Sequence, residues 1–156
     1  MRRVFSGIQP TGALHLGNYL GAVQHWVRLQ PPAPAAATEA PLFCLVDLHA
    51  MTLPYDAGRL SSNCRSLMAT LLACGLDPAR STLFRQSAVR EHTELAWLLS
   101  CATPLGWLER MTQFKEKGRQ SAVRGAAGLG LLSYPVLQAA DILLYKATSE
   151  CRRRRV

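Results

Sequence analysis

The hydrophobic positions of the chain form three short continuous runs, each followed by a longer stretch with helical spacing. The runs at 3–8, 42–47 and 81–86 predict β-strands, and the second is apolar enough to be buried on both faces of a sheet. Strands that alternate with helices in this way are typical of a parallel sheet wound in right-handed crossovers. The pattern therefore predicts an α/β fold.

The first and third periodic stretches predict helices over about 15–29 and 91–101. Their inward stripes are Leu16, Leu20, Val23 and Val27 in the first helix and Leu95, Leu98 and Leu99 in the third. A proline- and alanine-rich segment at 31–37 follows the first helix and indicates a surface loop.

The second periodic stretch carries signals at both of its ends. Asp56 is expected to cap the helix N-terminus, and Gly75 is expected to end the helix, with Pro78 shortly after. The apolar stripe of this helix comprises Leu60, Cys64, Leu67, Met68, Leu71 and Leu72. In a last helix, at 134–145, Pro135 suits the first turn.

Composition is that of an ordinary one-domain globular protein: 156 residues, 49% hydrophobic and 18% charged. No apolar run reaches the ~18 residues of a membrane helix, so no membrane partner is expected. The five cysteines include no Cys-x-x-Cys pair, which favours buried free thiols in a reducing compartment and no metal ligands. Four of the net +8 charges come from Arg152–Arg155, and the remaining excess is compatible with ATP and RNA as partners without specifying either.

The segment from Ser6 to Ala22 combines a strand end, a turn at Pro10–Gly12 and the start of a helix. Free backbone N–H groups and the positive end of the helix dipole converge there, which is the construction of an anion site. His15 and Asn18 add side-chain donors on one face of the first turn. The glycine spacing is neither G-x-G-x-x-G nor a P-loop.

The same segment resembles the tryptophanyl-tRNA synthetases. Its His-Leu-Gly-Asn at 15–18 is similar to the His-Ile-Gly-His signature of class I aminoacyl-tRNA synthetases, and the run at 5–22 is similar to the tryptophan family in particular. The resemblance continues in Val-Asp-Leu-His-Ala at 46–50, in Glu-Arg-Met-Thr-Gln-Phe-Lys-Glu-Lys at 109–117 and in Tyr-Pro-Val-Leu-Gln-Ala-Ala-Asp at 134–141.

The resemblance implies a Rossmann-like, doubly wound parallel sheet, the catalytic domain of a class I synthetase, present incompletely over residues 1–146. It also implies an enzyme, a tryptophan–tRNA ligase. Such an enzyme activates tryptophan with ATP to tryptophanyl-AMP and transfers it to tRNA(Trp), with Mg²⁺ held through the phosphates rather than by protein ligands. The family further implies a homodimer.

Site residues are carried over from the family motifs. Those implied for ATP are Gln9, Thr11, His15, Gly17 and Asn18, with catalytic roles for His15, Asn18 and Lys117. Those implied for tryptophan are Phe5, Gly7, Gln9, His49, Tyr134, Gln138 and Asp141. Asp141 would accept the indole N–H, and Tyr134 would lie near the amino group.

Each of three residues also has a plainer reading. The alternative for His49 is a loop histidine that is hydrogen-bonded to backbone. The alternative for Asp141 is a carboxylate at a helix end that is hydrogen-bonded to backbone. Lys117 is equally part of a solvated, glycine-containing surface segment.

After Lys146 the resemblance fails, and the basic segment 147–156 is expected to be disordered. The sequence has no Gly-x-Asp-Gln motif, Lys-Met-Ser-Lys-Ser loop or anticodon-binding region, so the chain is expected to be catalytically impaired. The alternatives are a non-catalytic fragment that dimerises with the full-length enzyme, or another nucleotidyl-transferring protein with a His-x-Gly-His type of site. Gln138 leans toward a mitochondrial protein, although no transit peptide precedes the first strand; a bacterial cytoplasmic protein is the alternative.

Overall fold

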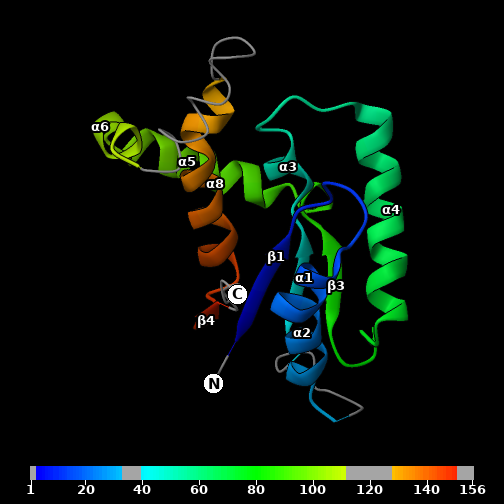
Figure 1. The fold of residues 1–156 in the computed structure, drawn as a ribbon. Helices are drawn as coiled ribbons and strands as arrows, with labels where there is room; N and C mark the ends of the chain where they lie inside the picture. The colour runs from blue at the N-terminus through cyan, green and yellow to red at the C-terminus, as the bar shows by residue number, and fades with distance from the viewer. Residues whose placement is uncertain (1–2, 33–39, 112–127, 151–156) are drawn as a thin grey trace.

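A four-stranded parallel sheet forms the centre of the computed structural model, which describes residues 3–32, 40–111 and 128–150 (Figure 1). The strands are β1 (Val4–Ile8), β2 (Leu42–Leu45), β3 (Thr82–Arg85) and β4 (Ser149–Glu150), and their order across the sheet is β3-β2-β1-β4. The α/β prediction and its three strands are confirmed. The linker at 31–37 lies largely outside the described residues.

One face of the sheet is covered by the helices that connect β1 to β2 and β2 to β3. The first connection runs without a break through α1 (Leu16–Asn18), a π-helical segment η1 (Tyr19–Val23) and α2 (Gln24–Leu29), and the second is α4 (Ala57–Ala73). Trp26 and Phe43 stack at the centre of this layer, with ring centroids 4.6 Å apart, and both side chains are fully buried. This layer is the larger part of the hydrophobic core.

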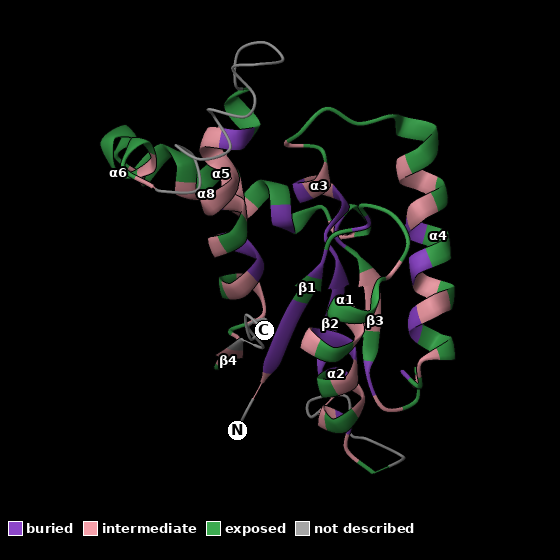
Figure 2. Ribbon diagram, in the orientation of Figure 1, coloured by how far each residue is buried: buried purple, intermediate pink, exposed green. Residues whose placement is uncertain are grey.

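On the other side of the sheet lie α5 (Glu91–Ala102) and α8 (Leu129–Leu144), which pack against each other, while α6 (Leu105–Glu109) follows α5 away from the strands and contacts α8 (Figure 1). Phe5, Cys44 and Val46 form a smaller core there with Phe84 and Tyr145. Residues alternate between the two faces along each strand, because successive side chains point to opposite sides. Figure 2 shows β1 mostly buried, while α6 is largely exposed.

The sheet reverses its winding direction at β1. From β1 the chain adds β2 and then β3 on one side, and it returns through α5, α6 and α8 to place β4 on the other side. In an open α/β sheet, ligands bind at the carboxyl ends of the strands where the order reverses. The carboxyl end of β1, at residues 7–9, occupies that position.

The predicted ends of α4 are confirmed. The Asp56 side chain accepts a hydrogen bond from the Arg59 backbone N–H at 2.7 Å, and Gly75 follows the helix with a φ of +102°. Only Leu72 in the expected stripe points outward, with 41% of its surface exposed.

The predicted inward face of the first helix is wrong at its N-terminal half. Leu16 and Leu20 are 71% and 52% exposed, whereas Trp26, which lies outside the predicted stripe, is completely buried. The segment Tyr19–Val23 is π-helical, so the residues before and after it are not related by the α-helical period on which the predicted stripe rests. In α5 the expectation fails at Leu98, which is 66% exposed.

Two further expectations differ from the structure. Helix α8 begins at Leu129, so Pro135 lies inside the helix rather than in its first turn. Residues 147–156 are not disordered throughout, because β4 pairs in parallel with β1 at Val4 and the preceding Thr148 N–H donates to the Arg3 carbonyl. The free edge of β1 supplies these partners, so a short polar segment can form a strand without an apolar pattern.

The cysteine prediction holds only in part. Cys44 and Cys64 are free and buried, and Cys74 is half-buried, but Cys101 is exposed, so not all the thiols are buried. Cys151 lies outside the described residues. Burial raises the pKa of the Cys44 thiol, and the nearby Asp141 and Asp47 carboxylates raise it further. Cys44 is therefore an unreactive core thiol.

Candidate active site

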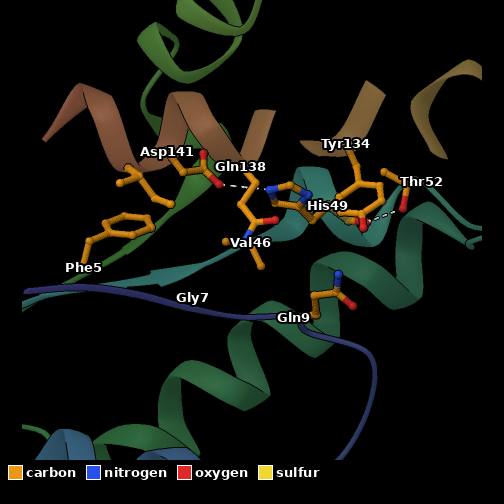
Figure 3. Close-up of a pocket in the computed structure, with 10 residues that line it drawn as sticks. Phe5, Gly7, Gln9, Val46, His49, Thr52, Tyr134, Gln138 and Asp141 are labelled. Atoms are coloured by element: carbon orange, nitrogen blue, oxygen red, sulfur yellow. Dashed lines mark hydrogen bonds and ion pairs between the residues drawn. The ribbon is translucent and has the colours of Figure 1, made fainter. Parts of the chain in front are cut away.

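A cavity of about 220 Å³ opens at the carboxyl end of β1, between that strand, α3 (Asp47–Ala50) and α8 (Figure 3). It is smaller than the roughly 300–1,000 Å³ typical of pockets for drug-sized ligands. Its lining residues are Phe5, Gly7, Gln9, Val46, His49, Thr52, Tyr134, Gln138, Asp141 and Ile142. All seven residues that the family motifs assign to tryptophan are therefore in this wall.

Helix α8 supplies one side of the cavity through a single face. Tyr134, Gln138 and Asp141 stand at i, i+4 and i+7, a spacing that places side chains above one another on one side of a helix. Figure 3 shows these three side chains projecting from the helix toward the strand that carries Gly7 and Gln9. The helical period thus brings polar groups to one wall of an otherwise apolar element.

The Asp141 carboxylate is buried in this wall and bonded by side chains rather than by backbone. His49 Nε2 lies 3.0 Å from Oδ2, and His92 Nδ1 lies 2.6 Å from Oδ1. The side-chain amide of Gln86 donates to both oxygens, at 2.8 and 2.9 Å. The plainer reading of Asp141 as a carboxylate bonded to backbone is therefore wrong, and so is the plainer reading of His49, whose ring is bound to Asp141.

These hydrogen bonds decide the charge of Asp141. Burial by itself would raise the pKa of the carboxyl, but the hydrogen bonds from His49, His92 and Gln86, with the charge of His49, outweigh it and hold the pKa below its usual value. Asp141 is thus a buried, ionised acceptor in the cavity wall. A buried carboxylate of this kind favours a ligand that brings an N–H donor.

His92 and Gln86 were missed by the sequence analysis. Both are fully buried, and they come from the segment that directly follows β3: Gln86 from the 3-10 turn η2 (Gln86–Ala88) and His92 from the first turn of α5. Polar residues just past the carboxyl end of a predicted parallel strand are a usable signal, because those ends share one edge of the sheet.

The short helix α3, which carries His49, is fixed to η2 by its first residue. Asp47 accepts hydrogen bonds from the Ser87 backbone N–H at 3.0 Å and from the Ser87 hydroxyl at 2.6 Å. The Arg85 guanidinium lies 3.5 Å from the same carboxylate. These contacts hold α3 against the neighbouring strand end and so fix the position of His49.

A second cavity, of about 260 Å³, lies on the other side of the β1 end, against the start of the first helix. Its lining residues are Ser6, Gly7, Ile8, Gln9, Thr11, Asn18 and Ala22. Gly7 and Gln9 line both cavities, so the two spaces adjoin at the carboxyl end of β1. Of the residues that the motifs assign to ATP, Gln9, Thr11 and Asn18 line this cavity, and His15 and Gly17 lie beside it at the helix start.

His15 is the N-cap of α1, and its ring orientation follows from that role. Its Nδ1 accepts a hydrogen bond from the Asn18 backbone N–H at 3.3 Å, so in the neutral ring the proton is on Nε2, which can donate to a ligand. A Cβ at position 17 would stand 3.1 Å from the His15 ring, so Gly17 leaves that ring its place. Within the described part of the chain, the buried Asn18 Oδ1 has no hydrogen-bond partner.

One predicted catalytic residue is not placed by the structure, and several residues that line the two cavities were not predicted. Lys117 lies outside the described residues, so the structure does not place it. The lining residues to which the motifs assigned no role are Val46, Thr52 and Ile142 in the first cavity and Ser6, Ile8 and Ala22 in the second. Among residues 3–32, 40–111 and 128–150, no cluster of three or more His, Cys, Asp or Glu side chains could hold a metal ion, and none of the helices there is long and apolar enough to cross a membrane.

The parallel sheet and its helices form a Rossmann-like α/β fold, and solved structures of class I synthetases align with this chain. Residues 1–151 match the family model described as tRNA synthetases class I (W and Y), so the chain belongs to this family.

Similar proteins within the family are tryptophan–tRNA ligases. The chain is 55% identical over 145 residues to "Tryptophan--tRNA ligase" of Parasynechococcus marenigrum, an alignment that covers 93% of this chain and 41% of the relative. It aligns at a TM-score of 0.80 and 40% identity with tryptophanyl-tRNA synthetase from Campylobacter jejuni complexed with ADP and tryptophan, covering 95% of this chain and 44% of that one. For the Mycoplasma pneumoniae enzyme the TM-score is 0.81 and the identity 39%, over 96% and 41% of the two chains.

The chain spans about two fifths of the length of these relatives. The expected likeness to the tryptophan family is confirmed. The mitochondrial expectation finds no support, because these relatives come from bacteria.

Proposed function

We propose that this chain is part of a tryptophan–tRNA ligase and that its two adjoining cavities bind tryptophan and ATP. The observation that carries the proposal is the shared wall of Gly7 and Gln9. A ligand in each cavity would meet the other at that wall. There a tryptophan carboxylate oxygen attacks the α-phosphorus of ATP, the bond to the bridging oxygen breaks, and pyrophosphate leaves. Transfer of the aminoacyl group to tRNA(Trp) then releases AMP.

The first cavity is the proposed tryptophan site. Asp141 would accept the indole N–H, because it is a buried, ionised carboxylate whose Oδ2 is bonded to a residue of the cavity wall, His49. Phenylalanine offers no donor to this group, and a buried acceptor left unpaired can reject such a ligand steeply. Tyr134 and Gln138, on the same face of α8, would contact the amino acid nearer its backbone.

The second cavity is the proposed ATP site. The first turn of the helical segment Leu16–Leu29 offers free backbone N–H groups and the positive end of a dipole to phosphate. His15 Nε2 and the Asn18 side chain add donors, and Thr11 and Gln9 complete the rim. Mg²⁺ would be held through the phosphates. The Campylobacter relative bound to ADP and tryptophan supports both assignments.

The chemistry asked of these residues is positioning and charge stabilisation rather than proton transfer. Losing one group that stabilises developing charge typically slows a reaction by about 10²–10³-fold. This sequence contains no Lys-Met-Ser-Lys-Ser motif, so the 156-residue chain alone is expected to form the adenylate slowly.

Two measurements on the purified chain test the proposal. Isothermal titration is expected to show tryptophan binding and much weaker tyrosine and phenylalanine binding. Tryptophan-dependent ATP–pyrophosphate exchange is expected to be at least about 10²-fold slower than in a full-length relative. Equal binding of the three amino acids would rule out the tryptophan assignment, and exchange near the rate of a full-length relative would rule out the impairment.

His15 allows the cap and the ligand contact to be separated. In His15→Asn the side chain can still cap the helix, but the distal donor is lost; we expect an unchanged thermal unfolding midpoint and at least about 10-fold weaker ATP binding. His15→Ala should lose the cap as well, at a cost of about 0.5–2 kcal/mol in unfolding free energy. ATP binding by His15→Asn at wild-type strength would exclude a phosphate contact from His15.

A second copy of this chain is the proposed protein partner. Large apolar side chains are exposed on consecutive helices: Trp97 and Leu98 on α5, and Leu105 and Trp107 on α6, each between 58% and 70% exposed. Exposed apolar clusters of this kind mark interaction surfaces. Sedimentation is therefore expected to give a dimer, and Trp107→Glu a monomer. A wild-type chain that sediments as a monomer at all concentrations would contradict this.

A further inference from the structure

Behind the proposed tryptophan site lies a directed chain of hydrogen bonds that ends on Asp141. The Tyr145 hydroxyl lies 2.8 Å from His92 Nε2, and His92 Nδ1 lies 2.6 Å from Asp141 Oδ1. Because the carboxylate can only accept, His92 Nδ1 carries the proton toward Asp141, and the Nε2 of the neutral ring accepts from Tyr145. Burial raises the pKa of Tyr145 to about 12, helped by the negative charges of Asp141 and Glu91, so the hydroxyl keeps its proton.

The two oxygens of Asp141 face different surroundings. Oδ1 is bonded to His92, which is fully buried and does not line the cavity, whereas Oδ2 is bonded to His49, which does. Gln86 bridges both oxygens from behind. These three donors make four contacts with a carboxylate that has about four acceptor sites, so a ligand donor would share Oδ2 with His49 and Gln86. Partial rotation of the carboxylate would break the short bond to His92, so this bond holds the carboxylate plane and keeps one oxygen directed at the cavity.

We infer that His92, itself oriented by Tyr145, is a positioning residue that fixes Asp141 with Oδ2 toward the cavity for an N–H donor of the ligand. The inference rests on the proposed tryptophan site and goes beyond it, because neither residue lines the cavity. His92 acts through Asp141 and does not touch the ligand. His92 and Tyr145 are therefore expected to increase the selectivity for a ligand with an indole N–H, in addition to any effect they have on the stability of the fold.

The hydroxyl of Tyr145 can be removed without removing its packing. Its ring stacks on Phe5 at 5.4 Å between centroids and packs edge-on against Phe84 at 5.7 Å, and both contacts involve the ring alone. Tyr145→Phe therefore deletes one hydrogen bond and keeps the apolar core. His92→Asn keeps a short side-chain donor in reach of Asp141, whereas His92→Leu leaves none.

The experiment compares two ligands by titration calorimetry on the full chain: tryptophan, and its benzothienyl analogue, in which sulfur replaces the indole N–H. The wild-type chain is expected to prefer tryptophan strongly. Tyr145→Phe should weaken tryptophan binding about 3- to 10-fold with analogue binding unchanged. His92→Leu should reduce the preference by at least about 10-fold, and His92→Asn should restore part of it. Tyr55→Phe, a hydroxyl deletion at a residue that is 48% exposed and outside both cavities, is the matched control.

The outcomes separate the inference from the function on which it rests. Equal weakening of both ligands in Tyr145→Phe, or no change in either, would overturn the positioning role while leaving the tryptophan site intact. A wild-type chain that binds neither ligand, or binds both equally, would overturn the proposed site and the inference with it. If His92→Leu fails to fold, Tyr145→Phe and His92→Asn still decide between these outcomes.

Discussion

Asp141→Asn is expected to weaken tryptophan binding by about 10- to 100-fold, because a hydrogen bond to a charged acceptor contributes about 1.5–3 kcal/mol. The asparagine has nearly the same shape, but its amide group turns a donor toward at least one of His49, His92 and Gln86, each of which donates to the carboxylate in the structure. The measurement is calorimetric titration with tryptophan. Asp77→Asn is the control, since that carboxylate accepts a bond from the Ala79 N–H outside both cavities.

The same substitution should change how stability depends on pH. The pKa of Asp141 is lower in the folded chain than its usual value of about 3.9, so its ionised form stabilises the fold above that pH. This contribution is lost as the pH falls through the folded-state pKa. The difference in unfolding free energy between the wild type and Asp141→Asn should therefore be largest near neutral pH and shrink below about pH 4. A difference that stays constant from pH 7 to pH 3 would show that the carboxylate charge does not contribute.

Gly7→Ala is expected to destabilise the fold by about 1–3 kcal/mol and to weaken binding in both cavities. An added Cβ would stand 2.8 Å from Val46 Cγ1 on the neighbouring strand, closer than real contacts allow. The two strands are paired through Gly7 and Cys44, so the backbone has little freedom to separate. Because Gly7 is part of the wall common to both cavities, a shift there displaces both proposed ligands.

Two comparison variants make the Gly7 result specific. Gly106→Ala adds a Cβ that meets nothing within 4 Å, and it should be neutral or slightly stabilising in α6. Val46→Ala in the Gly7→Ala background removes the colliding methyl and should recover much of the lost unfolding free energy. Thermal and urea unfolding measure both. Equal stability of Gly7→Ala and Gly106→Ala would contradict the proposed close approach.

Local signals were enough to place the main elements of the fold. The three apolar runs became β1, β2 and β3, and the Asp56 and Gly75 signals gave both ends of α4, because strand burial and helix caps depend on neighbouring residues. The seven residues that the family motifs assign to tryptophan also all lie in the wall of the first cavity. The roles of those residues stay predictions until ligands are tested.

Features that depend on distant contacts could not be predicted in the same way. Leu16 and Leu20 are exposed, although their spacing from Val23 and Val27 fits one face of an α-helix. The π-helical turn at Tyr19–Val23 interrupts that spacing. The bonds from Gln86 and His92 to Asp141 span 55 and 49 residues of chain, and no local pattern encodes such a pairing. β4 depends on the open edge of β1 rather than on its own sequence.

The walls of the first cavity come from three parts of the chain that are far apart in the sequence: the end of β1, the segment after β2, and α8. The α8 segment is held to the rest of the fold by its packing against α5, by Tyr145 in the smaller core, by the pairing of β4 with β1, and by Asp141 through His49 and His92. An amino acid bound between β1 and α8 would tie these parts together. A ligand that binds only the folded chain would therefore stabilise it against unfolding, by an amount that grows with the logarithm of the free ligand concentration once the site is saturated.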